Sequence, residues 1–491
     1  MLEKLEAIRE LESALALHLW DERTGMPTRG NDTRAAVVAR LRALIHAAYT
    51  DDELYDAARR TADNEGAADN EGAADNAGAA LAHALLRRLT RMRAVPAELA
   101  DAKSRAISRC VTAWHAARAS GSVNEWLEAF APLVRLIREE ASAVQSAGRG
   151  HASVYDVLLD RYEPELTESV LDELVGELVP RLRALREQLL PAMNAAPVAR
   201  HHPMPIADQR RLADEMIARL GVDGQGLRFG ETVHPFALLI GSGDVGLAVR
   251  FDPSDFITGL YSTLHEAGHV LYIQGIPEHL LWFGVDEEGA SHGIHESQSR
   301  FWENVIGRSD AFLEVLRPLL SVDQLASLNA TRLRVSSGVI RTAADEVSYN
   351  LHIAVRIRLE TSLIRGELAV PDLPVAWNDL YREYLGREPV DPVEGVLQDI
   401  HWSSGIIGGF PCYLMGNLYA AGMADAIERD VAPPETLIHS NRMATILDWL
   451  RTRVHRFGRI YPPGELFRRA TGNQISVQPF LNRLERRYLG G

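Results

Sequence analysis

Cysteine is scarce in this sequence, since only Cys110 and Cys412 occur among its 491 residues. Two cysteines can form neither a disulfide framework nor a cysteine-based metal motif. Low cysteine usage is also typical of proteins in a reducing compartment, so we expect a cytoplasmic protein.

An excess of positive charge is also absent, because the formal net charge is −15. Binding to phosphate groups needs clustered lysine and arginine, so this balance argues against a nucleic-acid partner. The arginines are interleaved with acidic residues, as at 483–487. We interpret such runs as solvated helix faces.

Long apolar runs are missing as well. The first residues carry charges among leucines spaced as in an amphipathic helix, and they lack the uninterrupted apolar core of a signal peptide. The one long uncharged stretch, 401–424, contains five glycines and a proline. We therefore interpret it as a buried, irregular segment lining an active site, and we expect no membrane partner.

Helical periodicity covers most of the chain, with 171–190 and 440–454 as good examples. Strand signals are few, and the best candidate is 245–251, entered through the turn-like residues 241–244. We therefore expect a mainly α protein with one small β-sheet.

No segment resembles an interdomain linker, so we expect residues 1–491 to form a single helical domain. The repeat at 62–79 reads ADNEGA, ADNEGA, ADNAGA. Its small polar residues cannot bury a core, and this predicts a flexible loop between two helices.

The stretch LHEAGHVLY, at 264–272, carries the strongest chemical signal. Ser254 and Asp255 can cap a helix that runs to about Gly275. On that helix His265 and His269 are one turn apart and can bind one Zn²⁺ together. Glu266, ~100° around the helix, can hold the water that the metal activates without competing for the metal.

The alternative is an ordinary helix that contains this motif by chance. The apolar flanks favour function, because buried polar groups need partners. Gly268 costs ~1 kcal/mol of helix propensity but permits close approach of another element.

A catalytic zinc needs a third protein ligand and one open position. The compact HExxHxxGxxH pattern is absent, since Tyr272 and Gly275 stand where its glycine and third histidine would be. The downstream candidates are His292, His295, Glu296 and Glu303. We favour Glu296, which begins a helix-like run; the alternatives are a surface glutamate or a partner of a liganding histidine.

Several further motifs occur in the order found in one family, and together they cover most of the chain. They are HLWDERTGMPTRG (18–30), YDVLLDRYEPELT (155–167), HPF (234–236), HEAGH (265–269), HES (295–297), IRTAAD (340–345) and GVLQDIHW (395–402). On these residues the chain resembles the carboxypeptidase Taq family of metallocarboxypeptidases, in which the glutamate of HES is the third metal ligand.

Two segments depart from the family pattern. The family's DxRxT is DVGLA here, with Gly246 and Ala248 at the arginine and threonine positions. Its YEPG is YEPE, ending at Glu165. Neither change removes a predicted metal ligand, but a missing arginine can alter substrate affinity, substrate preference or dimer packing.

The resemblance implies a mainly helical zincin fold, shared with neurolysin and peptidyl-dipeptidase-like enzymes, with a deep active-site cleft. It further implies a homodimer that releases single C-terminal residues from peptides with a free C-terminus. Zinc is the usual metal and cobalt is possible.

Roles can then be assigned to side chains. Glu266 is expected to act as general base and acid. Arg341 is a candidate for binding the substrate carboxylate through its planar fork, and the alternative is a structural pair with Asp345 on one helix face. Tyr413 is a candidate donor to the developing oxyanion, and the alternative is a packed aromatic side chain.

Further side chains are candidates for supporting roles. His234 and His401 are candidates for substrate contacts. Asp345, Asp399 and His295 are expected to orient arginines, histidines or ligands from behind.

Two rival functions remain open. A zinc oligopeptidase would use the same chemistry but would cut internally or release dipeptides. A catalytically degenerate family member would serve as a binding or scaffold protein; retention of Glu266 weighs against this reading.

Overall fold

The structure is a computed structural model that describes residues 1–65, 77–148, 150–195, 202–281 and 290–490. The chain divides into two compact units, each assembled from three segments. The first unit comprises Met1–Leu89, Ala199–Arg332 and Gly416–Ile475. The second comprises Thr90–Val198, Leu333–Met415 and Ser476–Gly491. The organisation of residues 1–491 as a single domain stays a prediction.

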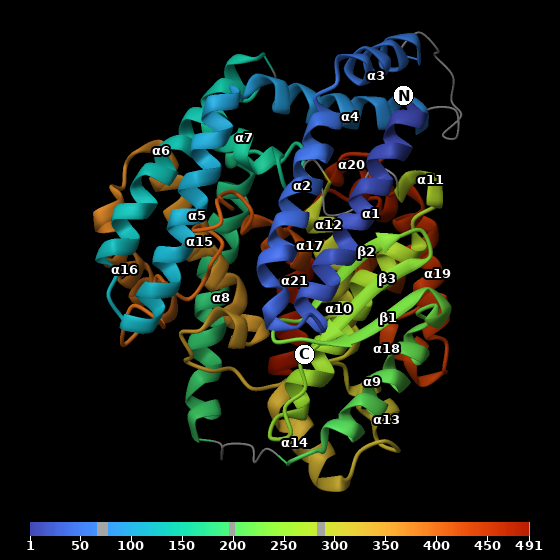
Figure 1. Ribbon diagram of the computed structural model, residues 1–491. Helices are drawn as coiled ribbons and strands as arrows, with labels where there is room; N and C mark the ends of the chain where they lie inside the picture. The colour runs from blue at the N-terminus through green and yellow to red at the C-terminus, as the bar shows by residue number, and fades with distance from the viewer. Residues whose placement is uncertain (66–76, 149, 196–201, 282–289, 491) are drawn as a thin grey trace. The chain divides into compact units, whose positions relative to one another are not determined.

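The first unit contains the sheet and most of the short helices (Figure 1). Its α-helices are α1 (Leu2–Thr24), α2 (Asn31–Tyr49), α3 (Asp52–Glu65), α9 (Ile206–Leu220), α10 (Phe256–Gly275), α11 (Glu278–Leu281), α12 (His292–Arg300), α13 (Asp310–Leu316), α14 (Val322–Arg332), α18 (Pro434–His439), α19 (Met443–Arg453) and α20 (Pro463–Thr471). Short 3₁₀ turns are η1 (Thr28–Gly30), η2 (Gly224–Gly226) and η6 (His455–Phe457), and η3 (Phe301–Ile306) is π-helical.

Long helices and tight turns make up the second unit. Its elements are α5 (Ala97–Ser120), α6 (Asn124–Ser146), α7 (Val154–Asp160), α8 (Glu168–Ala195), η4 (Arg341–Ala343), α15 (Glu346–Arg365), η5 (Val370–Asp372), α16 (Leu373–Leu385) and α21 (Gln478–Leu489). Helices α4 (Ala77–Ala94) and α17 (Pro411–Asp430) continue from one unit into the other. The expectation of a mainly α protein with one small sheet is confirmed.

The sheet has three strands in the order β1-β3-β2. The central strand β3 (Asp244–Val249) pairs in parallel with β1 (Leu227–Glu231) and antiparallel with β2 (Phe236–Gly241). The predicted strand is therefore confirmed, although it ends two residues early. Helix α10 packs against β3, which places the metal motif next to the sheet (Figure 1).

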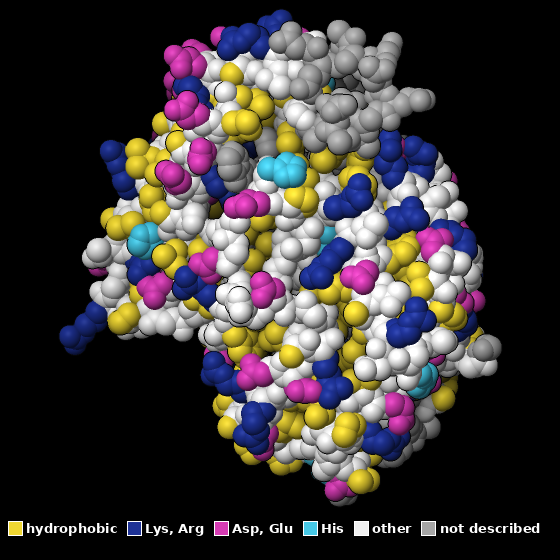
Figure 2. All heavy atoms as spheres, turned by 90° about the vertical axis from the view of Figure 1, so that its right-hand side faces the viewer, with side chains coloured by type: hydrophobic (Ala, Val, Ile, Leu, Met, Phe, Trp, Pro, Cys, Tyr) yellow, Lys and Arg dark blue, Asp and Glu magenta, His cyan; other side chains and the backbone are white. Residues whose placement is uncertain are grey.

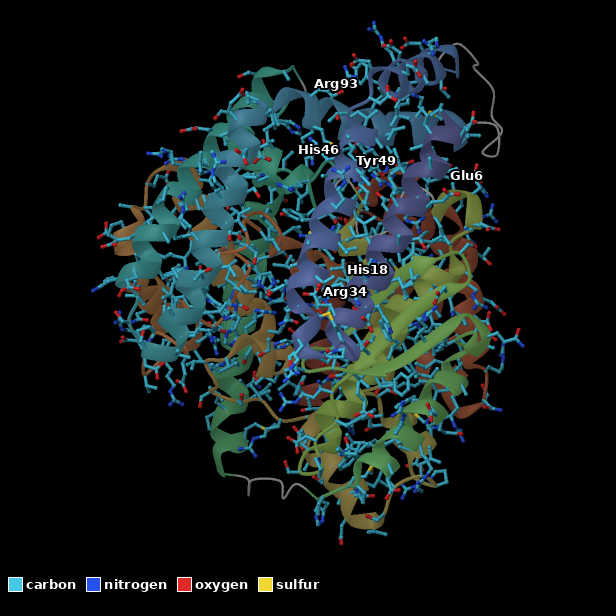
Figure 3. All side chains as sticks on the ribbon, in the orientation of Figure 1. Glu6, His18, Arg34, His46, Tyr49 and Arg93 are labelled. Carbon is cyan, nitrogen blue, oxygen red and sulfur yellow. The ribbon has the colours of Figure 1, made fainter. Side chains whose placement is uncertain are left out.

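Helix α1 packs against the sheet through Trp20, whose ring lies over two strand glycines. A Cβ atom at Gly246 would be 2.4 Å from this ring, and one at Gly230 would be 3.0 Å from it. Figure 3 shows Arg34 of α2 next to His18 of α1, and Arg34 Nη1 lies 2.6 Å from His18 Nδ1. Residues of the N-terminal motif thus join α1 to α2 and pack α1 against the sheet.

Both ends of the repeat are helical, since α3 continues to Glu65 and α4 begins at Ala77. The high helix propensity of alanine accounts for these extensions. The predicted loop was 62–79, and its central residues 66–76 lie outside the described part of the chain.

Charges of both signs are interspersed on the face that Figure 2 shows. Within the described residues, no helix combines the length and the apolar character needed to cross a membrane.

Candidate metal centre

Helix α10 forms as its sequence predicts. The carboxylate of Asp255 accepts a hydrogen bond from the backbone N–H of Thr258 at 3.1 Å, which caps the first turn. The helix ends at Gly275, and most of its side chains are buried. Because His265 and His269 are one turn apart, their rings meet on one face, with centroids 5.0 Å apart.

Gly268 brings α12 into direct contact with α10. A Cβ atom at this position would lie 2.6 Å from Gln298 O and 2.6 Å from Ser299 Cα, so only glycine fits. Glu296 stands on α12 two residues before Gln298, and Gly416 packs against its side chain. The backbone contact therefore holds the Glu296 carboxylate beside the two histidines.

Three side chains form the only group of potential metal ligands found among the described residues: His265, His269 and Glu296, whose ligand atoms all lie within 4.8 Å of one another. Oε2 of Glu296 is 3.7 Å from His265 Nε2 and 3.5 Å from His269 Nε2. Two atoms each ~2.1 Å from one tetrahedral ion are roughly 3.4 Å apart. The donor set and its spacing therefore fit a divalent ion such as Zn²⁺.

Glu266, the residue after the first histidine, is 6% exposed. Burial raises the pKa of its carboxyl to about 7, with the charge of His265 opposing the shift. A carboxylate with a pKa near neutrality can both accept and return a proton. Its position and its basicity suit a general base.

The surrounding charges perturb the other groups in different directions. Burial lowers the pKa of His265, but Glu296 and Glu303 more than offset this effect and raise it to about 8. Burial and the neighbouring His295 lower the pKa of His269 to about 4. Burial alone would raise the pKa of Glu296, yet Arg300, at 2.7 Å from its Oε1, and His265 hold it well below its usual range. The third ligand candidate is thus an anion near neutral pH.

Other predicted residues lie in the second unit, where Asp399 joins two arginines. Its Oδ1 accepts from Arg341 at 2.7 and 3.0 Å, and its Oδ2 accepts from Arg356 Nε at 2.7 Å. Arg341 is 8% exposed and Arg356 fully buried. One carboxylate therefore faces two guanidinium groups, and the group keeps one excess positive charge.

The suggested pair between Arg341 and Asp345 on one helix face is not formed. Asp345 is the N-cap of α15 and accepts from the backbone N–H groups of Val347, Ser348 and Ser336. Arg341 lies in the preceding 3₁₀ turn and contacts Asp399. This alternative is wrong because the helix begins only after Asp345.

Tyr413 also belongs to the second unit, and its hydroxyl lies 3.2 Å from His401 Nε2. Burial lowers the pKa of His401 to about 4, so its ring is neutral near neutral pH. His234 is an exposed residue just before β2, in the first unit. His295 is buried, and its ring centroid is 4.4 Å from that of His269.

Sequence reasoning missed two partners. Glu303 was one of four candidates for the third ligand, but its Oε2 lies 2.9 Å from His265 Nδ1, the ring nitrogen that faces away from the ligand group. Its position two helical turns after Glu296 was a usable signal. No sequence pattern pointed to Arg356, because its pairing with Asp399 arises only from the tertiary fold.

The mainly helical fold and the His-His-Glu group beside a buried glutamate together define the class: a metal-dependent peptide hydrolase of the HExxH type. Comparison with known families names it more closely. The chain belongs to the carboxypeptidase Taq (M32) metallopeptidase family, whose model matches residues 1–488. Membership implies a divalent metal.

Individual relatives agree over nearly the whole length. Thermostable carboxypeptidase 1 of Thermus thermophilus is 36% identical in an alignment that covers 97% of this chain and 95% of that protein. Carboxypeptidase 1 of Bacillus subtilis is 32% identical over 99% of this chain and 96% of its own. The crystal structure of the M32 carboxypeptidase from Deinococcus radiodurans R1 has a TM-score of 0.90 and 29% identity, covering 99% of this chain and 97% of that one. The expected family and enzyme class are confirmed.

Proposed function

We propose that this protein removes single residues from the free C-terminus of peptides, with Zn²⁺ held by His265, His269 and Glu296. The observation that carries the proposal is the buried Glu266, which directly follows the first histidine of this group. A divalent ion held there would activate a water molecule and polarise the scissile carbonyl. Co²⁺ would suit the same donors.

Glu266 performs the proton transfers. Its carboxylate takes a proton from the attacking water and returns it to the leaving amine, a contribution of ~10²–10⁴ in rate. Because the carboxyl is buried, its pKa lies close to neutral pH, where a base keeps enough charge to accept a proton. Acid–base work therefore needs no second side chain.

Arg341 is the proposed partner of the substrate carboxylate. Support comes from the excess positive charge of the group formed with Arg356 and Asp399, because a buried unbalanced charge favours an anionic ligand. The neighbouring His401 is neutral and adds no charge. His401 and His234 remain proposed substrate contacts.

Tyr413 is the proposed donor to the oxyanion. Its hydroxyl lies within hydrogen-bond distance of His401, whose ring is neutral near neutral pH and can accept this hydrogen bond. When substrate binds, the Tyr413 hydroxyl can donate to the oxyanion in place of His401. A homodimer and a cytoplasmic location are part of the proposal, the first from family resemblance and the second from low cysteine usage.

The test uses zinc-loaded protein and one N-terminally blocked peptide with either a free or an amidated C-terminus, with the products read by mass. We expect stepwise loss of single residues from the free peptide only, and a loss of rate of at least ~10² in Glu266→Gln. Glu314→Gln, which alters an exposed carboxylate paired with Arg317, is the matched control and should keep full activity.

Other products would point to the rival functions. Internal cuts, or cleavage of the amidated peptide, would indicate an oligopeptidase. Stoichiometric metal binding without any cleavage would favour a binding or scaffold role.

A further inference from the structure

The two ring nitrogens of His265 face different partners. Nε2 points into the ligand group and lies 3.7 Å from Glu296 Oε2. Nδ1 lies 2.9 Å from Glu303 Oε2. A carboxylate accepts hydrogen bonds, so Nδ1 keeps its proton, and in the neutral ring Nε2 carries the lone pair that a metal needs.

Glu303 is held in place by the backbone and by two arginines. It lies in the π-helical segment η3, where the N–H of Gly307 donates to Trp302 O five residues back, at 3.0 Å. Single π-helical turns are frequent near functional sites. The Glu303 side chain, 13% exposed, is 3.5 Å from Arg300 Nη1 and 3.4 Å from Arg308 Nη2.

The arginines have further anchors of their own. Arg300 Nε also donates to Glu296 at 2.7 Å, so it joins the proposed ligand to Glu303. The guanidinium of Arg308 lies over the ring of Tyr261, 4.2 Å from its centroid. Glu303 is thus fixed from three sides, which limits its conformers to those that face His265.

His269 has no equivalent support. Among the described residues, its buried Nδ1 has no hydrogen-bond partner. Its ring is instead packed against that of His295, with centroids 4.4 Å apart. Of the two Nδ1 atoms in the histidine pair, only that of His265 has a hydrogen-bond partner within the described structure, and this partner is Glu303.

We propose that Glu303 is a positioning residue, which fixes the tautomer and ring orientation of His265 for metal binding without binding the metal itself. This inference rests on the proposed metal centre. Carboxylates behind a liganding histidine typically contribute about 10- to 100-fold to metal affinity or activity.

The experiment measures Zn²⁺ dissociation constants of the full-length apoprotein by competition with a chromophoric chelator near neutral pH. Glu303→Gln keeps the size of the side chain but removes its charge, and we expect it to weaken binding about 10- to 100-fold. Glu303→Asp keeps the charge and should recover part of the loss. Glu296→Gln removes a proposed ligand and should weaken binding further, whereas Glu314→Gln is the matched control and should change little.

Two more readouts separate orientation from other roles. The melting temperature of each apoprotein reports a purely structural effect. The absorption spectrum of the Co²⁺-loaded proteins reports the ligand set, and the spectrum of Glu303→Gln should match that of the wild type because the donors stay the same.

An unchanged dissociation constant in Glu303→Gln would overturn the positioning role, even if the apoprotein were less stable. A loss as large as that of Glu296→Gln, with a changed Co²⁺ spectrum, would overturn it in favour of direct ligation. Peptide hydrolysis is scored separately: wild-type protein that binds zinc but trims no peptide refutes the proposed function and leaves this result standing.

Discussion

Gly268 provides a sharp test of how α10 and α12 build the metal centre. In Gly268→Ala the new Cβ would lie 2.6 Å from both Gln298 O and Ser299 Cα. Both are backbone atoms, so no side chain can rotate away. Ordinary van der Waals contact begins at 3.4 Å, and α12 must therefore move by about 0.8 Å.

The magnitude follows from two opposing effects. Alanine is favoured over glycine by ~1 kcal/mol inside a helix. Overpacking of a well-packed interior costs ~1–3 kcal/mol, occasionally more. The free energy of unfolding should therefore fall by up to about 2 kcal/mol. Because Glu296 is part of α12, its carboxylate should move with the helix relative to the two histidines. This movement exceeds the ~0.2 Å by which metal–ligand distances can vary.

The assay combines denaturant unfolding of the apoprotein with Zn²⁺ affinity. Gly176→Ala is the matched control, because Gly176 is an exposed residue inside α8 and an added Cβ would meet nothing within 4 Å. That control should gain ~0.5–1 kcal/mol and keep the affinity. If Gly268→Ala were also stabilised, with unchanged zinc binding, the close backbone contact between α10 and α12 would be refuted.

Three further predictions address the second unit. Burial raises the pKa of Glu360 from its ordinary value of 4.5 to about 7, so the folded protein binds this proton more tightly than the unfolded chain does. The free energy of unfolding should therefore fall by up to about 3 kcal/mol as the pH rises from 4.5 to 7. Glu360→Gln should remove this part of the pH dependence, and parallel unfolding profiles from pH 4.5 to 7 would contradict the reasoning. Glu165 adopts a left-handed backbone with φ 68°, so Glu165→Gly should be more stable to heat than Glu165→Ala by about 1 kcal/mol, and equal stabilities would show that the strain is absent. Arg341→Ala should raise KM for free peptides about 10- to 100-fold, with kcat little changed, because it removes charge-assisted bonds to the substrate carboxylate. The control is Arg358→Ala, which alters a half-exposed ion pair. Similar KM values in both variants would argue for a structural role of Arg341.

Local signals explain which elements the sequence predicted. The cap at Asp255, the apolar periodicity and the final glycine all lie within α10, so its two ends were predicted correctly. Strand β3 was predicted because it is a short apolar run after a turn. Strands β1 and β2 were missed because they are short and are stabilised by pairing with β3, which a local pattern does not contain.

The uncharged segment 401–424 shows the limit of compositional reasoning. Its first ten residues form turns, as expected, but Pro411 begins the long helix α17. Glycines 416 and 422 lie inside that helix because neighbouring side chains, Glu296 and Phe467, occupy the space where a Cβ would be. The glycines in this segment predicted an irregular backbone, but at 416 and 422 glycine is required by close packing within a regular helix.

The candidate site divides in the same way. His265 and His269 share one helix, so their relation could be derived from spacing alone. The partners that tune the groups, Glu303 on His265 and Arg356 on Asp399, come from other helices or from a π-helical turn. A glutamate that can be a ligand and one that can orient a ligand have the same sequence signature, and only the ring nitrogen that each faces separates them.

The departure at Gly246 also has a structural reason that sequence comparison does not give. The Trp20 ring occupies the space next to this glycine, and it also contacts Gly230 and the edge of Phe236, with ring centroids 5.5 Å apart in the latter pair. Any side chain at 246 must displace the indole and so disturb the packing of α1 against the sheet. The missing arginine is therefore coupled to the packing of the N-terminal motif, and it cannot be restored by one substitution. On β3 the side chains of Val245 and Leu247 point to the face opposite Gly246, away from the indole.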